Sequence, residues 1–291
     1  MITDALKKGL MLIFRSWKIF FIYYIFVALM ALILILPASY TIIKDVGLTV
    51  KAGSLIKSFT PVTFIEIIVN NYPGLLKFYL PYMLIVLVLF IMGALFLSGG
   101  ALSMYTMRKN SIVEYFTESI AYFGSILRGF LLMIPFYILA IVIFFLLSLL
   151  RREYIVEKGW EMTYYIVQII SLIVLLFLLN FVSMLFDYLR ITIIASNEKK
   201  VFVGFKKAFS FVFSHSGKTL GLFYLISISE FIFIIIFLAL KNLLATHTMF
   251  TILLYAVIAQ LGIAVRIMGR LLTYASQQAL YQNLNKGETT L

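Results

Sequence analysis

The sequence predicts an all-α integral membrane protein with six transmembrane helices. The residues are 63% hydrophobic, only 12% are charged, and the apolar residues are concentrated in six long continuous runs. A chain with so little polar surface cannot cover a water-soluble globule, whereas lipid can cover it. Runs of about 20 apolar residues match the hydrocarbon core of a bilayer. Their continuity favours helices over the alternating strands of a barrel.

The six predicted spans follow the apolar runs in order along the chain. They are Ile19–Leu36, Phe78–Leu97, Phe130–Leu150, Met162–Phe186, Leu220–Leu240 and Met249–Ile267. Between the first two lies a long outer segment, Ala38–Lys77, in which we expect a short apolar helix over Pro61–Asn70, ended by a turn over Asn71–Gly74. The ends of the second, fourth and sixth spans have related patterns, and we expect each of these helices to continue past the headgroups.

The distribution of basic residues predicts the orientation of the spans. The predicted outer segments hold eight of the 24 lysine and arginine residues, namely Lys44, Lys51, Lys57, Lys77, Arg151, Arg152, Lys158 and Lys241. The remaining 16 lie in the segments on the other side. The positive-inside rule therefore places both termini in the cytoplasm.

A charged amphipathic segment precedes each odd-numbered span, which indicates a threefold repeat of helix hairpins. When the three segments are superposed, Leu6, Phe116 and Phe205 coincide, as do Gly9, Ser119 and Ala208, and Ile13, Phe123 and Val212. Apolar residues at these spacings form one face of a helix, so we expect three interfacial helices on the cytoplasmic side. The chain is then a single transmembrane domain, 1–291, with repeat units 1–109, 110–199 and 200–291.

Glu230 is the most unusual residue, because it lies about halfway along the fifth predicted span. A carboxylate at that depth is costly and often belongs to a proton or cation pathway. Asn180, Gln260 and Arg266 are its candidate partners in an intramembrane polar seam. The alternative is that the same side chains form hydrogen bonds that align neighbouring helices.

Asp187 and Arg190 are three residues apart, so on a helix they share a face at the cytoplasmic end of the fourth span. Arg266 and Arg270 are four apart and repel each other unless an anion lies between them. Asp187, Glu230 or a lipid phosphate could supply that anion. We therefore expect a cytoplasmic clamp of Asp187, Arg190 and Arg270 that ties the fourth span to the sixth.

The segment before the fifth span combines basic and aromatic residues, which suits an anionic membrane surface. Its candidate contacts for lipid headgroups are Lys199, Lys200, Lys206, Lys207 and Lys218. The net charge of +12 comes from cations beside the membrane spans, where they set the orientation of the chain and face anionic lipid headgroups. No nucleic-acid partner is therefore expected. A membrane-protein partner or a homo-oligomer stays open, because the small residues around Gly99 could pack within the chain or between two chains.

No catalytic residue, cofactor or metal site is expected. The chain has no cysteine and two distant histidines, His215 and His247, which is too few for a zinc site. Gly217-Lys218-Thr219 lacks the upstream glycine of a phosphate-binding loop, since position 212 is Val212. Paired acids and activated nucleophiles are also not visible.

Three stretches of the sequence resemble an uncharacterised bacterial family of six-span membrane proteins. They are Asp187-Tyr188-Leu189-Arg190-Ile191, His215-Ser216-Gly217-Lys218-Thr219-Leu220-Gly221, and Tyr274-Ala275-Ser276-Gln277-Gln278-Ala279-Leu280-Tyr281. The chain is similar in design to the membrane domain of bacterial glycerophosphodiester phosphodiesterases, without their catalytic domain. The resemblance implies six helices in a prokaryotic inner membrane, and it gives no reason to expect the phosphodiesterase activity.

Two functions compete on these observations. The first is a noncatalytic module that binds or organises lipids or a membrane partner through its interfacial helices. The alternative is a transporter or channel for an ion or small substrate that uses the seam around Glu230. The basic and aromatic segments support the first, and the acid in the middle of a span supports the second.

Overall fold

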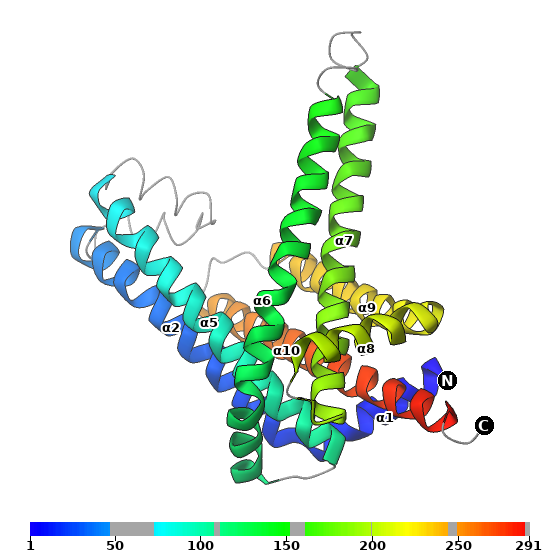
Figure 1. Ribbon diagram of the computed structural model, residues 1–291. Coiled ribbons are helices and arrows are strands. Elements are labelled where there is room, and N and C mark those ends of the chain that lie inside the picture. Colours follow the sequence, from blue (N-terminus) through cyan, green and yellow to red (C-terminus); the bar gives the residue numbers. More distant parts are fainter. Residues whose placement is uncertain (47–72, 108–110, 152–160, 199, 244–248, 289–291) are drawn as a thin grey trace. The chain divides into compact units, whose positions relative to one another are not determined.

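The computed structural model describes residues 1–46, 73–107, 111–151, 161–198, 200–243 and 249–288. Over these ranges it contains eight helices and no strand (Figure 1). They are α1 (Ile2–Arg15), α2 (Trp17–Val46), α5 (Pro73–Met107), α6 (Ile112–Arg151), α7 (Glu161–Ala195), α8 (Val201–Ser214), α9 (Ser216–Leu243) and α10 (Met249–Glu288). In six of them, all except α1 and α8, a stretch is long and apolar enough to cross a membrane. The predicted all-α fold with six spans is confirmed, and the chain is a polytopic membrane protein.

Several helices extend beyond the predicted spans. α5, α7 and α10 continue to Met107, Ala195 and Glu288, as expected for the second, fourth and sixth spans. The predicted turn over Asn71–Gly74 is wrong in its second half, because α5 already begins at Pro73. Proline is tolerated in the first helical turn, where its missing N–H would have no partner in any case. The predicted helix over Pro61–Asn70 lies outside the described residues.

The amphipathic segments are separate helices in two of the three predicted places. α1 and α2 are interrupted at Ser16, and α8 and α9 at His215, where the backbone leaves the helical region. Ser214, His215, Ser216 and Gly217 form a run of weak helix formers there. The segment that begins at Ile112 is instead continuous with the third span in α6. A helix that has begun propagates cooperatively through a strongly apolar sequence.

The chain divides into two compact units. The first comprises Met1–Arg15, Ser98–Ile226 and Leu272–Leu291, and the second comprises Ser16–Leu97 and Ser227–Leu271. In the first unit, α6 and α7 form a long antiparallel hairpin (Figure 1). The core of this unit is made by the ends of α5, α7 and α10, because residues 98–105, 184–194 and 273–280 are buried without interruption. A helix buried on all its faces lies inside its unit.

Each amphipathic segment of the first unit packs against one of these three buried helix ends. A Cβ atom on Gly9 of α1 would overlap Ser276 of α10, and one on Gly100 of α5 would overlap Ser119 of α6. A Cβ atom on Gly204 of α8 would lie 3.2 Å from Ile193 of α7. Small residues let the helix backbones approach closely at these crossings. The small-residue face around Gly99 and Gly100 therefore packs within the chain.

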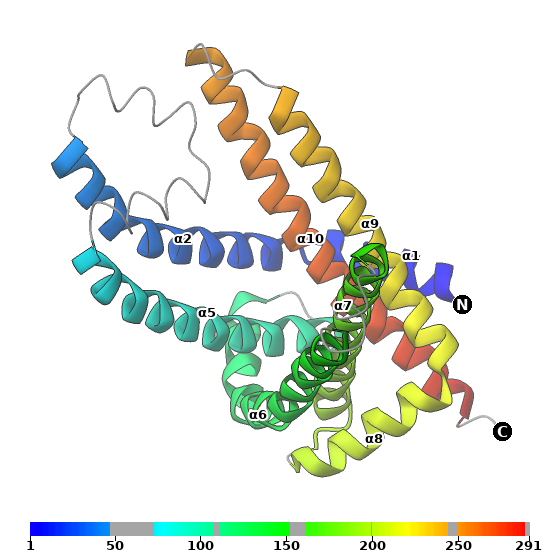
Figure 2. The same ribbon diagram turned by 90° about the horizontal axis from the view of Figure 1, so that it is seen from above.

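In the second unit, α2 lies beside the first part of α5, and α9 lies beside the first part of α10 (Figure 2). Phe26 of α2 stacks on Phe90 of α5 with ring centroids 5.7 Å apart, and a Cβ atom on Gly93 would overlap the Phe26 ring. Most outward side chains on these helices are large and apolar. In a chain of this class, that exposed apolar surface is the surface that lipid covers.

Candidate functional site

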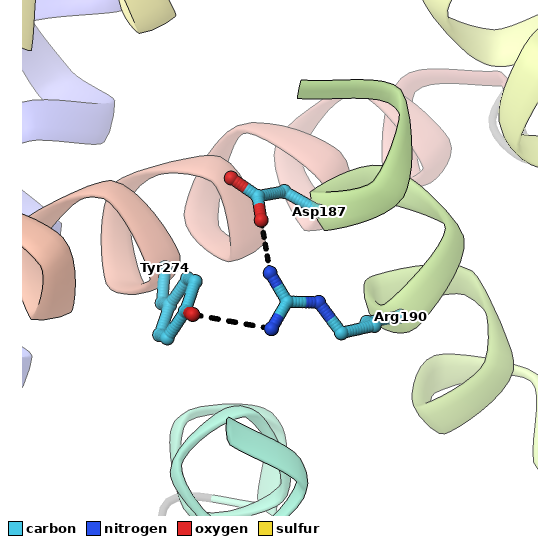
Figure 3. A network of polar contacts seen from close by, with 3 residues as sticks. All are labelled: Asp187, Arg190 and Tyr274. Carbon is cyan, nitrogen blue, oxygen red and sulfur yellow. Dashed lines mark hydrogen bonds and ion pairs between the residues drawn. The ribbon is translucent and has the colours of Figure 1, made fainter. Parts of the chain in front are cut away.

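The best-defined polar site joins α7 to α10 inside the first unit. Asp187 and Arg190 are buried, and the Arg190 Nη2 atom donates a hydrogen bond to Asp187 Oδ1 (Figure 3). The Arg190 Nη1 atom donates to the hydroxyl of Tyr274, 3.1 Å away. The spacing of three along α7 places both charges on one face, as the sequence analysis expected. Arg190 therefore donates hydrogen bonds to two helices, to the Asp187 carboxylate on α7 and to the Tyr274 hydroxyl on α10.

Aromatic rings enclose the same guanidinium. The Cζ atom of Arg190 lies 4.4 Å from the ring centroid of Phe186 and 4.8 Å from that of Tyr274. Such cation–π contacts favour a cation that has lost its water. The connection from α7 to α10 runs through Arg190 and Tyr274. Arg270, the third member of the predicted clamp, belongs to the second compact unit.

More polar groups are buried around this site. Tyr105 of α5 and Tyr115 of α6 are buried, and both lie near Tyr274. Gln277 and Gln278 follow Tyr274 on α10 with no exposed surface, and within the described residues neither side-chain amide has a hydrogen-bond partner. An unsatisfied buried polar group costs about 1–3 kcal/mol. The centre of the first unit thus contains several buried polar side chains.

Sequence reasoning did not single out Tyr105, Tyr274, Gln277 or Gln278 as site residues. Tyr274 is separated from Gln277 and Gln278 by three and four residues, so one helix face carries all of them. That pattern is visible in the sequence, but it lies beyond Ile267, the end of the predicted sixth span. The sequence did not predict a site here, because the polar part of α10 follows the end of the predicted span and was expected to lie beyond the headgroups.

The residues of the predicted seam have separate local environments. Asn180 donates from Nδ2 to the Leu176 carbonyl one turn earlier in α7, at 2.9 Å. Gln260 of α10 accepts a hydrogen bond from the Tyr24 hydroxyl of α2, at 2.6 Å. Glu230 lies near the middle of α9 and packs against Gly269 of α10, where a Cβ atom would overlap the Glu230 carboxylate. Asn180 belongs to the first unit, and Glu230, Gln260 and Arg266 belong to the second.

The predicted headgroup contacts lie on and beside α8. Lys200, Lys206, Lys207 and Lys218 are exposed, and Lys199 lies outside the described residues. Lys207 Nζ is 3.7 Å from a carboxylate oxygen of Glu198, in an exposed ion pair that contributes little to stability. These cations are therefore accessible on the surface.

Acidic and histidine side chains do not cluster in the part of the chain that the structure describes. Within those ranges, no three of them come close enough together to hold a metal ion. The polar groups that do meet there are the buried network around Arg190 and the exposed lysines of α8.

Comparisons with protein-family models, with curated proteins and with solved structures found no significant match for this chain.

Proposed function

We propose that this protein is a noncatalytic module of the bacterial inner membrane that binds anionic lipids through α8 and α1 on the cytoplasmic side. The observation that carries the proposal is the surface of α8. Gly204, Ala208, Phe211 and Val212 are buried, and the remaining surface of the helix divides into an aromatic stripe and a basic stripe.

The aromatic stripe of α8 is exposed and continuous. Phe202, Phe209 and Phe213 are 73%, 41% and 53% exposed, and their spacings of seven and four place them on one face. Phe205 lies between them, with ring centroids 6.5 Å from Phe202 and 5.9 Å from Phe209. Exposed phenylalanine rings along an amphipathic helix favour insertion into the boundary between headgroups and acyl chains.

Lysines lie beside this stripe and supply the charge. At 100° per residue, Lys206 and Lys207 lie on the face of α8 between the aromatic stripe and the buried residues. Each lysine close to an anionic membrane surface contributes about 1 kcal/mol of attraction. The α8 surface therefore has the two components of an interfacial lipid-binding helix.

α1 has the same three-part design. Ala5, Gly9 and Ile13 are buried, Leu10 and Phe14 are exposed apolar residues, and Lys7 and Lys8 are exposed. In the superposition of the three amphipathic segments, Lys7 and Lys8 coincide with Lys206 and Lys207. The corresponding residues of α6 are Thr117 and Glu118, so we expect no anionic lipid to bind there.

The transport alternative has less support. Gln260 of α10 accepts a hydrogen bond from Tyr24 of α2, which is the arrangement of residues that align helices, and Asn180 donates to a carbonyl of its own helix. Glu230 packs against Gly269, a contact that any role of its carboxylate must accommodate. We therefore keep lipid binding as the proposed function.

The test is native mass spectrometry of the delipidated protein titrated with phosphatidylglycerol or with phosphatidylcholine. Replacing Lys206 and Lys207 with glutamine should weaken phosphatidylglycerol binding by roughly 30-fold and leave phosphatidylcholine binding unchanged. The matched control replaces both lysines with arginine, which keeps the charge. Equal binding of phosphatidylglycerol by the glutamine variant and the native chain would contradict the proposal.

A further inference from the structure

Gln278 of α10 lies between two tyrosines that contact neighbouring helices of the first unit. It follows Tyr274 by four residues and precedes Tyr281 by three, so the three side chains share one face of α10. The Tyr274 hydroxyl accepts a hydrogen bond from Arg190 of α7. The Tyr281 ring packs on Phe211 of α8, with ring centroids 4.7 Å apart. The Gln278 side chain therefore faces the region where α7 and α8 meet α10.

Tyr188 of α7 lies beside the same contact. Its ring centroid is 5.4 Å from that of Phe211, the ring on which Tyr281 also packs. Tyr188 and Gln278 are both 0% exposed. Within the residues that the structure describes, neither the Tyr188 hydroxyl nor the Gln278 amide has a hydrogen-bond partner. Two polar groups from different helices are thus buried in one region without a direct partner.

Further buried polar groups without a partner lie around Tyr274. Gln277 points about 100° away from Gln278 around the axis of α10, and Tyr105 of α5 lies near Tyr274. The Gln277 amide and the Tyr105 hydroxyl are also buried, and over the described ranges neither has a hydrogen-bond partner. Each such group has lost its bulk water, and only another hydrogen bond offsets that loss.

Water is the ligand whose chemistry fits these groups. Amides and phenols are neutral and can both donate and accept hydrogen bonds, and the Arg190 guanidinium among them is already paired with Asp187. A buried water molecule typically makes about three hydrogen bonds to polar groups that have no other partner. Ala275, three residues before Gln278, is buried, and its side chain is too short to fill the space beside the amide.

We propose that the core of the first unit binds internal water molecules, which link the Gln278 amide on α10 to the Tyr188 hydroxyl on α7. This water joins the two helices at a second point, one turn along α10 from the hydrogen bond between Arg190 and Tyr274. The proposal is independent of lipid binding by α8, because it uses buried groups and none of the exposed lysines.

The experiment is X-ray radiolysis of the native protein in detergent and oxygen-free buffer, followed by mass spectrometry of its peptides. X-rays convert water to hydroxyl radicals, which modify the side chains that they meet first. A buried side chain is therefore modified where a water molecule lies beside it. We expect modification of Tyr188, although its side chain has no exposed surface. Met133 of α6 is the reference, because it is equally buried and methionine is the more reactive residue type.

Gln278→Leu removes the amide that holds the water, so the modification of Tyr188 should be lost. The matched control is Gln282→Leu, the same substitution one turn further along α10 at a half-buried position, and it should keep the modification. Circular dichroism spectra identical to that of the native protein establish that each variant is folded. Gln278→Met, which keeps the length of the side chain, replaces Gln278→Leu if that variant does not fold.

Modification of Tyr188 no greater than that of Met133 in the native protein would overturn the proposal. Equal modification of Tyr188 in the native chain and in Gln278→Leu would also overturn it, because water would then reach Tyr188 by opening of the unit. Replacing Lys206 and Lys207 with glutamine should leave the modification unchanged. This result separates the internal water from the binding of lipid by α8.

Discussion

Arg190 is a fully charged side chain with 2% of its surface exposed. Its position is tolerable because Asp187 neutralises it, the Tyr274 hydroxyl accepts a hydrogen bond from it, and its Cζ atom lies over the rings of Phe186 and Tyr274. A buried ion pair adds little net stability compared with apolar residues of the same size, but breaking it leaves a charge without compensation. Asp187 and Arg190 should therefore behave as one unit.

We expect Asp187→Asn to destabilise the protein by roughly 3–5 kcal/mol, because the Arg190 guanidinium would stay buried without its counter-ion. The double variant Asp187→Leu, Arg190→Met removes both charges and should recover most of that loss. Heat unfolding of Asp187→Leu, Arg190→Met and the double variant in mild detergent, followed by circular dichroism, measures the coupling. Losses in the double variant that equal the sum of the two single losses would exclude a coupled pair.

At the scale of the helices, the three amphipathic segments lie close to the buried ends of α5, α7 and α10. The crossing of α5 and α6 is especially close. A Cβ atom on Gly100 would overlap the Ser119 hydroxyl and lie 2.8 Å from the Tyr115 carbonyl oxygen. A backbone atom cannot move aside as the end of a flexible side chain can. Close packing therefore requires glycine at this position.

Gly100→Ala should destabilise the protein by about 1–3 kcal/mol through overpacking at this crossing. Gly124→Ala in α6 is the matched control, because nothing lies within 4 Å of a Cβ atom there. In that open position alanine should be neutral or stabilising by up to about 1 kcal/mol, as its helix propensity exceeds that of glycine. Similar unfolding temperatures for the two variants would show that the helices do not meet at Gly100.

The packing of the amphipathic segments also bears on the hypothesis of a threefold repeat. Gly9, Ser119 and Ala208, which coincide in the superposition, are all buried, and so are Ala5, Tyr115 and Gly204 four residues earlier. Each amphipathic segment also packs against the last helix of the preceding predicted unit, with α1 on α10 completing the cycle. These contacts support the threefold repeat, which stays a prediction of the sequence.

For the whole molecule, the six spans define a polytopic membrane protein, and the orientation follows only from the distribution of lysine and arginine. Six is an even number, so six crossings would leave both termini on one side of the membrane, and the positive-inside rule predicts that this side is the cytoplasm. The chain contains no cysteine. Single introduced cysteines can therefore report the orientation without background.

Thr117→Cys in α6 and Ser214→Cys in α8 replace exposed residues that we place on the cytoplasmic side, and Ser54→Cys falls in the predicted outer segment. A membrane-impermeant maleimide applied to intact spheroplasts should label position 54 alone. Positions 117 and 214 should react only after the membrane is permeabilised. The reverse pattern would invert the orientation and place the α8 surface away from the cytoplasmic lipids.

Spacing along one helix predicts some contacts of the candidate sites, but it does not predict their contacts with other helices. The contact of Asp187 with Arg190 follows from their separation of three residues, a property of one helix. The partner on α10 does not follow, because Tyr274 is 84 residues away in sequence and only packing brings it to Arg190. Glu230 is similar, since its depth in α9 is readable from the sequence while its contact with Gly269 is not.

The class of the protein, its six spans and the extension of the even-numbered spans can all be predicted from the sequence, because hydrophobic length and helical periodicity are local properties. The tertiary structure decided what those helices enclose. It placed Tyr105, Tyr274, Gln277 and Gln278 in a buried polar core, and it gave Asn180 and Gln260 separate partners. Contacts between distant helices depend on how side chains fit across a crossing, and a single sequence does not show which faces will meet.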